Sequence, residues 1–88
     1  MVEFPVARYL LIIENAGDNL SAYFPDVPGC VTVGDTVEEV RRHAHEALTG
    51  HLEDEPELPN ERGLRELLEA GEVDEAGAEA ITWVQYVR

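Results

Sequence analysis

Three histidines and one cysteine are the side chains of this 88-residue chain best suited to metal binding or nucleophilic chemistry. Ligands that share one helix face are three or four residues apart. His43 and His45 are two residues apart, and His51 lies about 80° around a helix from His43. Nothing in the spacing supplies Cys30 with the histidine and base that a nucleophile needs, so we interpret it as a small buried apolar residue. We expect no metal site, no cofactor and no catalytic cysteine.

Carboxylates are abundant, but their placement does not favour catalysis. Two-metal nucleases need several carboxylates that converge on a cation pair. The interior of the first apolar segment, residues 9–13, contains no acid. Asp26 and Asp35 lie in predicted turns, where aspartate bonds to the local backbone. The glycines of the acidic region are isolated and form no phosphate-binding loop. We expect neither an enzyme nor a small-molecule substrate.

The chain is strongly acidic: it contains 19 acidic and six basic residues, for a formal net charge of −13. Affinity for nucleic acid comes largely from Lys and Arg that neutralise phosphates, so we expect no direct nucleic-acid binding by this chain. The charge instead favours a basic protein partner, whose approach such a field would steer. The alternative is that the charge serves solubility alone.

The elements that must position these residues begin with three predicted strands. Residues 6–14 form a nearly continuous apolar run, typical of a central strand covered on both faces. A turn at 15–19 leads to an alternating strand, 20–24. A third strand, 30–33, follows a corner at 25–29, whose two prolines cannot sit inside a central strand because they lack the N–H donor. Glycine at its end allows a positive φ.

A helix is predicted from Thr36 to Leu52. The Thr36 hydroxyl and the Glu39 side chain can form a capping box at its start. Apolar residues then recur at spacings of three and four, from Val37 onward, and give one apolar face. Pro56 rules out continuation of the helix.

An acidic connection, residues 53–79, follows this helix and contains a short helix from residue 62 or 63 to 70. Leu64, Leu67 and Leu68 lie on one face of the short helix. These leucines either cover the core or bind a partner. The last strand is residues 80–87, whose Trp83 and Tyr86 serve as core and rim or lie at an interface.

The element order is therefore β-β-β-α-(short α)-β, an α+β fold in one domain, residues 1–88. We expect an antiparallel three-stranded meander plus a last strand parallel to the first, packed on one helix. A small open sheet without a disulfide gains from association, so we expect a dimer or tetramer formed through the last strand or an exposed sheet edge. No apolar run is long enough to span a membrane and no signal segment is present, so we expect a cytoplasmic protein.

Two adjoining motifs carry a family resemblance. The corner reads Phe-Pro-Asp-Val-Pro-Gly-Cys (24–30), and the helix start reads Gly-Asp-Thr-Val-Glu-Glu (34–39). They resemble the HicB-like antitoxin family, whose pattern is "Phe-Pro-Asp-x-Pro-Gly-Cys" followed by "Gly-Asp-Thr-x-Glu-Glu-Ala". The residues that carry the resemblance are Phe24, Pro25, Asp26, Pro28, Gly29, Cys30, Gly34, Asp35, Thr36 and Glu39.

The resemblance implies a truncated ribonuclease-H-like fold and a protein-binding function. Such an antitoxin covers the active site of a HicA-like toxin, a small basic ribonuclease that cleaves mRNA. Many members add a C-terminal DNA-binding domain. This chain stops at Arg88, directly after the predicted last strand, so we expect no such domain and no operator binding. The alternative is a stand-alone, homo-oligomeric structural or regulatory domain without a toxin.

Overall fold

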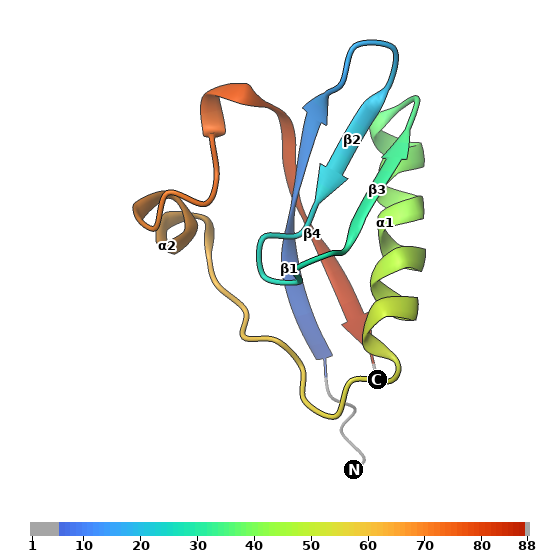
Figure 1. Ribbon diagram of the computed structural model, residues 1–88, viewed down its shortest axis with the longest axis vertical. Helices are drawn as coiled ribbons and strands as arrows, with labels where there is room; N and C mark the ends of the chain where they lie inside the picture. Colours follow the sequence, from blue (N-terminus) through green and yellow to red (C-terminus); the bar gives the residue numbers. More distant parts are fainter. Residues whose placement is uncertain (1–5, 88) are drawn as a thin grey trace.

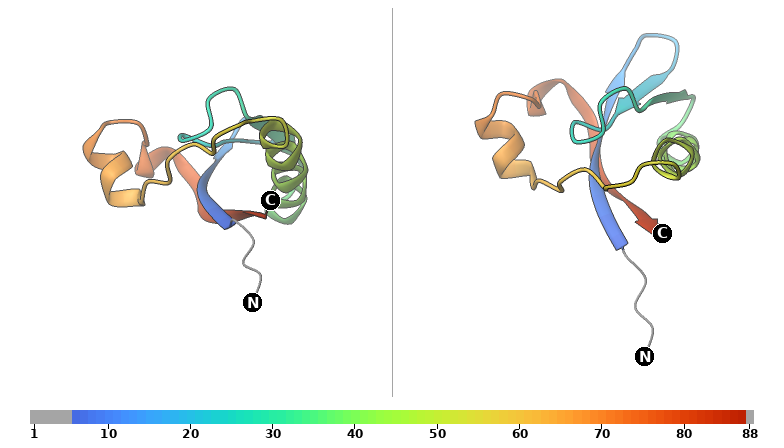
Figure 2. Two further views of the ribbon diagram at one scale, coloured as in Figure 1. Left: turned by 90° about the horizontal axis from the view of Figure 1, so that it is seen from below. Right: turned by 60° about the horizontal axis from the view of Figure 1, so that its bottom comes forward.

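A computed structural model of the chain describes residues 6–87. The described elements are β1 (Val6–Asn15), β2 (Leu20–Tyr23), β3 (Val31–Gly34), α1 (Val37–Leu52), α2 (Leu64–Glu69), the 3-10 turn η1 (Glu75–Gly77) and β4 (Ala78–Val87). The strands form one sheet in the order β3-β2-β1-β4. Helix α1 covers one face of this sheet, and α2 lies on the other side (Figures 1 and 2). Within residues 6–87, no helix is long and apolar enough to cross a membrane.

Strand β1 is the centre of two hydrophobic clusters, because its unbroken apolar run points side chains to both faces of the sheet. On the α1 side, β1 contributes Ala7, Tyr9, Leu11 and Ile13, which pack with apolar residues of α1, β2 and β4. On the other side the buried residues are Leu10, Ile12, Leu67 and Val73. The prediction of a central strand covered on both faces is confirmed.

Helix α1 begins where the sequence predicts. Thr36 is its N-cap, and the Thr36 hydroxyl accepts a hydrogen bond from the Glu39 amide at 3.1 Å. One helix face is buried, and its residues are Val40, Ala44, Leu48 and Leu52. Val37, at the start of the predicted apolar face, is 39% exposed.

The predicted direction of the last strand is also wrong, because β4 runs antiparallel to β1. The two strands pair from Val6 opposite Val87 to Glu14 opposite Ala78. Helix α1 runs back along β3, so a strand that followed it directly would run parallel to β1 (Figure 1). Instead residues 53–77, called the strap below, begin on the α1 side, cross to the other side of the sheet and travel back along it. The chain then enters β4 from the opposite end.

Apolar and hydrogen-bonding contacts fix the strap to the sheet. Leu58 packs against the cluster on the α1 side, and the Tyr9 hydroxyl donates to the Pro59 carbonyl at 2.8 Å. Further along, Leu67 and Val73 are buried against the opposite face. Helix α2 lies inside the predicted range 62–70 and is followed by Gly71, whose φ of +73° suits a helix end.

Candidate protein-binding surfaces

The proline corner between β2 and β3 is held by short-range backbone hydrogen bonds. The Val27 amide donates to the Phe24 carbonyl, and the Cys30 amide donates to the Val27 carbonyl, both at 3.1 Å. Gly29 has a φ of +85°, which confirms the predicted positive φ. Phe24 and Cys30 are buried, and burial raises the pKa of the Cys30 thiol. The corner therefore packs Phe24, Val27 and Cys30 into the core and leaves Pro28 exposed.

Asp26 in this corner anchors the strap. Its carboxylate, 8% exposed, accepts from the Arg62 backbone amide at 2.7 Å and from Arg62 Nε at 2.6 Å. Arg62 also forms a two-pronged ion pair with Glu72, and this pairing lowers the pKa of Glu72. Hydrogen bonds to Glu72 and then Asp26 raise the pKa of Arg62. The expectation that Asp26 bonds to its local backbone is wrong, since its hydrogen-bond partner, Arg62, is 36 residues away.

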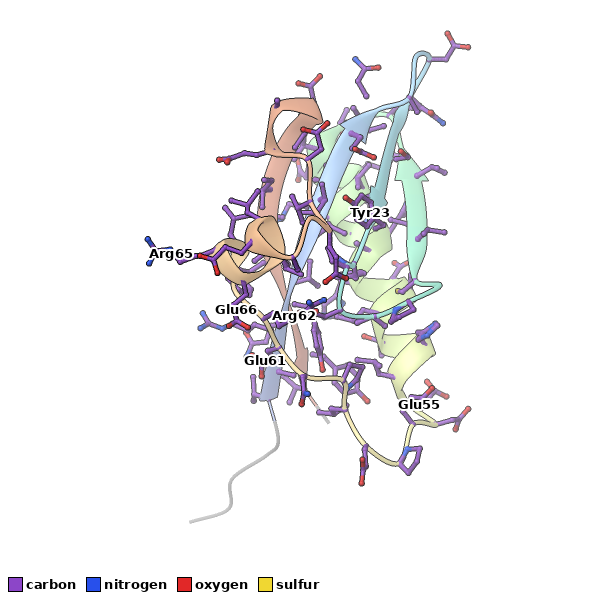
Figure 3. All side chains as sticks on the ribbon, turned by 60° about the vertical axis from the view of Figure 1, so that its left-hand side comes forward. Tyr23, Glu55, Glu61, Arg62, Arg65 and Glu66 are labelled. Atoms are coloured by element: carbon purple, nitrogen blue, oxygen red, sulfur yellow. The ribbon has the colours of Figure 1, made fainter. Side chains whose placement is uncertain are left out.

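Figure 3 shows how differently the two arginines of the strap are placed. Arg62 lies between the strap and the corner, whereas Arg65 extends away from the body of the protein from α2. Arg62 was not among the site residues predicted from the sequence. Its only local signal is a cation within an acidic stretch, which does not identify its partner.

The second signature motif joins β3 to α1 at close quarters. A Cβ on Gly34 would lie 2.8 Å from Val40 Cγ2 and 3.1 Å from the Val40 amide nitrogen, so the position has no room for a side chain. Asp35 is exposed, Thr36 caps the helix and Glu39 is half-buried. The structure thus gives much of the signature a framework role; any contact of these residues with a partner stays a prediction.

The histidines do not form a cluster. His43 Nδ1 donates to the Val33 carbonyl at 2.8 Å, which fixes α1 to β3. His45 and His51 are exposed. In the described part of the chain, no three His, Cys, Asp or Glu side chains are grouped so that they could hold a metal ion.

The structure divides the five residues predicted as a partner surface. Leu67 and Tyr86 are buried in the two hydrophobic clusters, so they do not form an exposed surface in this structure. Leu64 is half-buried, while Leu68 and Trp83 are 36% and 43% exposed. Their binding role stays a prediction.

The strap makes one side of the molecule acidic. Between residues 53 and 77 it carries ten carboxylates and two arginines. All ten acidic residues are exposed; they are Glu53, Asp54, Glu55, Glu57, Glu61, Glu66, Glu69, Glu72, Asp74 and Glu75. The negative charge of the strap also acts on Tyr23 in the sheet. Burial is the largest cause of the raised pKa of Tyr23, and the nearby charges of Glu14 and Asp74 raise this pKa further. An acidic band therefore borders the sheet face opposite α1.

An apolar groove lies beside this acidic band and was not predicted. Val31 and Val33 on β3 are 67% and 54% exposed, next to Tyr23 on β2. With neighbouring residues of β2 and β3, these three line a groove of about 520 Å³. A second hollow brings Tyr23 and Val31 together with Glu72 of the strap. The surface of Tyr23, Val31 and Val33, called the β3 patch below, thus has an apolar centre and an acidic border.

Comparison with known proteins gives one matching family and one similar phage protein. The family described as "HicB_like antitoxin of bacterial toxin-antitoxin system" matches residues 9–84. An uncharacterized 14.9 kDa protein from the rep-hol intergenic region of Haemophilus phage HP1 is 38% identical over 64 residues. This match covers 68% of the chain, and the chain spans about half (48%) of the phage protein.

Three solved structures share the fold. A chain of the HicA3 and HicB3 toxin-antitoxin complex superposes with a TM-score of 0.68 and 25% identity, over 89% of this chain and 95% of that one. The crystal structure of antitoxin HicB3 superposes with a TM-score of 0.70 and 24% sequence identity. The match covers 89% of this chain and 60% of the HicB3 chain. The N-terminal domain of Burkholderia pseudomallei antitoxin HicB superposes with a TM-score of 0.65 and 18% sequence identity. The match covers 91% of this chain and 95% of that domain.

Proposed function

The chain belongs to the HicB-like antitoxin family of bacterial toxin–antitoxin systems, and from this premise we propose that it binds and masks a small basic toxin. The partner is a HicA-like ribonuclease, the kind of protein named in the complex whose chain shares this fold. The chain acts by binding, not by catalysis, and works in the cytoplasm, where such a toxin meets mRNA.

The observation that carries this proposal is the β3 patch with its acidic border. Protein interfaces combine an apolar centre, which loses water on binding, with a polar rim. Here the two valines supply apolar area, and the strap supplies negative charge complementary to a protein that binds RNA. Opposite charges speed the encounter of the two proteins and exclude RNA from the covered surface.

The test uses the full chain and the product of a neighbouring short basic reading frame. The substitution V31D places a charge in the β3 patch, and this charge would become buried when the partner binds. The fold should tolerate the substitution because Val31 is 67% exposed. We expect V31D to abolish inhibition of the toxin's ribonuclease activity. The matched control is T49D, on the exposed surface of α1, which should inhibit as well as wild type.

Charge steering is tested by the rate of association. Replacement of Glu66 and Glu69 on α2 with Gln should slow association at low salt and change dissociation little, because rim charges act mainly on the on-rate. Equal inhibition by wild type and V31D, with unchanged association rates, would refute this site. A neighbouring protein that neither binds nor loses ribonuclease activity would refute the masking function itself.

A second candidate is self-association into a dimer or tetramer, favoured by the same exposed valines. Exposed apolar side chains on β3 can pack against the same surface of a second copy. Sedimentation of the chain alone above 9.8 kDa, with V31D reduced to the monomer, would support it.

A further inference from the structure

A second groove, with the opposite charge, lies between α1 and β4. It has a volume of about 810 Å³ and is lined on the α1 side by Val37, Glu38, Arg41, Arg42 and His45 and on the β4 side by Trp83, Val84 and Gln85. In a chain of net charge −13, two adjacent arginines here face a single glutamate. Within residues 6–87, neither Arg41 nor Arg42 forms an ion pair with a carboxylate.

The groove lies along a free sheet edge. In the order β3-β2-β1-β4, strand β4 is ten residues long and pairs only with β1 among the described strands. An edge strand presents unpaired N–H and C=O groups that an incoming strand can bond. The other edge, β3, is only four residues long, and His43 already bonds to the Val33 carbonyl. Strand addition is therefore better accommodated at β4.

Trp83 contributes to the lining of the groove, although its position in β4 belongs to the opposite face of the sheet. It lies opposite Leu10, whose side chain is on the sheet face away from α1. Trp83 is 43% exposed, and the Arg8 guanidinium lies over its ring, 5.6 Å from the ring centre. Side chains of a strand added to β4 would alternate between the two faces. On one face they would meet Arg41 and Arg42, and on the other they would meet Trp83.

We propose that the β4 edge binds an extended acidic segment of a partner protein by strand addition. Acidic side chains at every second position face Arg41 and Arg42, and apolar side chains between them pack on Trp83. Binding of this kind combines a main-chain hydrogen-bond ladder with side-chain specificity. This site lies along β4, at the opposite edge of the sheet from the β3 patch, and does not depend on the toxin-masking function.

Charge decides among the other occupants of the groove. Two-fold pairing of β4 with β4 of a second copy would bring the same surface patch together with itself, so that arginines would face arginines. A nucleic acid would meet a protein of net charge −13, and its affinity depends on neutralising phosphates. An acidic polypeptide meets the same net charge, but its main chain forms a hydrogen-bond ladder with the free edge of β4, which a nucleic acid cannot do.

Trp83 is the only tryptophan, so its fluorescence reports on the groove directly. The probe is a capped ten-residue peptide of alternating Glu and Val, titrated into the full chain. Controls are the Gln–Val peptide and a single-stranded oligothymidine. We expect a saturable change in Trp83 fluorescence with the Glu–Val peptide and with neither control. Binding of this peptide should also slow hydrogen exchange in residues 78–87.

Matched variants test the two arginines. R41Q/R42Q should weaken binding of the Glu peptide by about tenfold, the scale of two lost ion pairs. The control R65Q removes an exposed arginine from α2 and should bind as wild type. Equal binding of the Gln and Glu peptides, binding of oligothymidine alone, or no response to any probe would overturn the proposal.

Discussion

Substitution of Asp26 with Asn tests whether the signature corner holds the strap. The two side chains have nearly the same shape, but Asn offers one acceptor oxygen where Asp offers two. The Asp26 carboxylate receives the Arg62 amide at 2.7 Å and Nε at 2.6 Å. In D26N, one of these donors must face an NH₂ group, so one of the two hydrogen bonds is lost.

The expected cost follows from the burial of the acceptor. A hydrogen bond to a charged group contributes about 1.5–3 kcal/mol, and Asp26 is only 8% exposed. A chain of this length has a free energy of unfolding of about 4–13 kcal/mol. D26N should therefore remove a substantial part of the stability and lower Tm by at least about 6 °C.

Thermal and urea melts followed by circular dichroism measure this change, and hydrogen exchange at the Arg62 amide reports whether the anchor itself has opened. The matched control is D18N, in the exposed hairpin loop between β1 and β2. We expect D18N to melt as wild type does. If D26N and D18N have the same midpoint and the Arg62 amide stays protected, Asp26 does not anchor the strap.

Four further predictions concern single residues. Gly29→Val should destabilise the protein by more than about 1 kcal/mol, because the φ angle at this position is +85°. Gly50→Ala, in the exposed part of α1, should stabilise the protein by up to about 1 kcal/mol. Urea midpoints equal to that of wild type would contradict both predictions. Pairing with Arg62 lowers the pKa of Glu72, so its stabilisation is present above the unfolded pKa of about 4.3 and is lost as pH falls through the folded pKa. The difference in Tm between wild type and E72Q should accordingly shrink below about pH 4. Burial raises the pKa of Cys30, so alkylation at neutral pH should be slow in the folded chain and fast in urea; equal rates would show that the thiol is accessible.

The parts of the fold that the sequence predicts are those determined locally. Proline excludes a central strand, glycine permits the positive φ of the corner, and Thr36 supplies a cap for the helix that follows. Each of these effects acts within a few residues. The corner and the start of α1 are therefore placed correctly, with Gly29 and the Thr36 cap confirmed.

The parts that the sequence does not predict depend on distant partners. The direction of β4 follows from the path of the strap, which is fixed by contacts such as that of Leu67 with the far face of β1. The partner of Asp26 lies 36 residues along the chain. The exposure of Val31 and Val33 follows from the position of β3 at an edge, which an apolar alternation does not reveal.

The strap links these observations, because it determines both proposed binding surfaces. Its packing against Leu10 and Ile12 covers the second face of β1, and its carboxylates provide the acidic border of the β3 patch. Its path along the sheet also reverses the direction of the chain before β4 begins, so β4 pairs antiparallel to β1 and leaves its other edge beside α1. A connection too short to travel the length of the sheet would leave Leu10 and Ile12 without this cover. It would also bring the last strand in from the opposite end. The same segment therefore separates an acidic surface on one side of the sheet from a basic groove on the other.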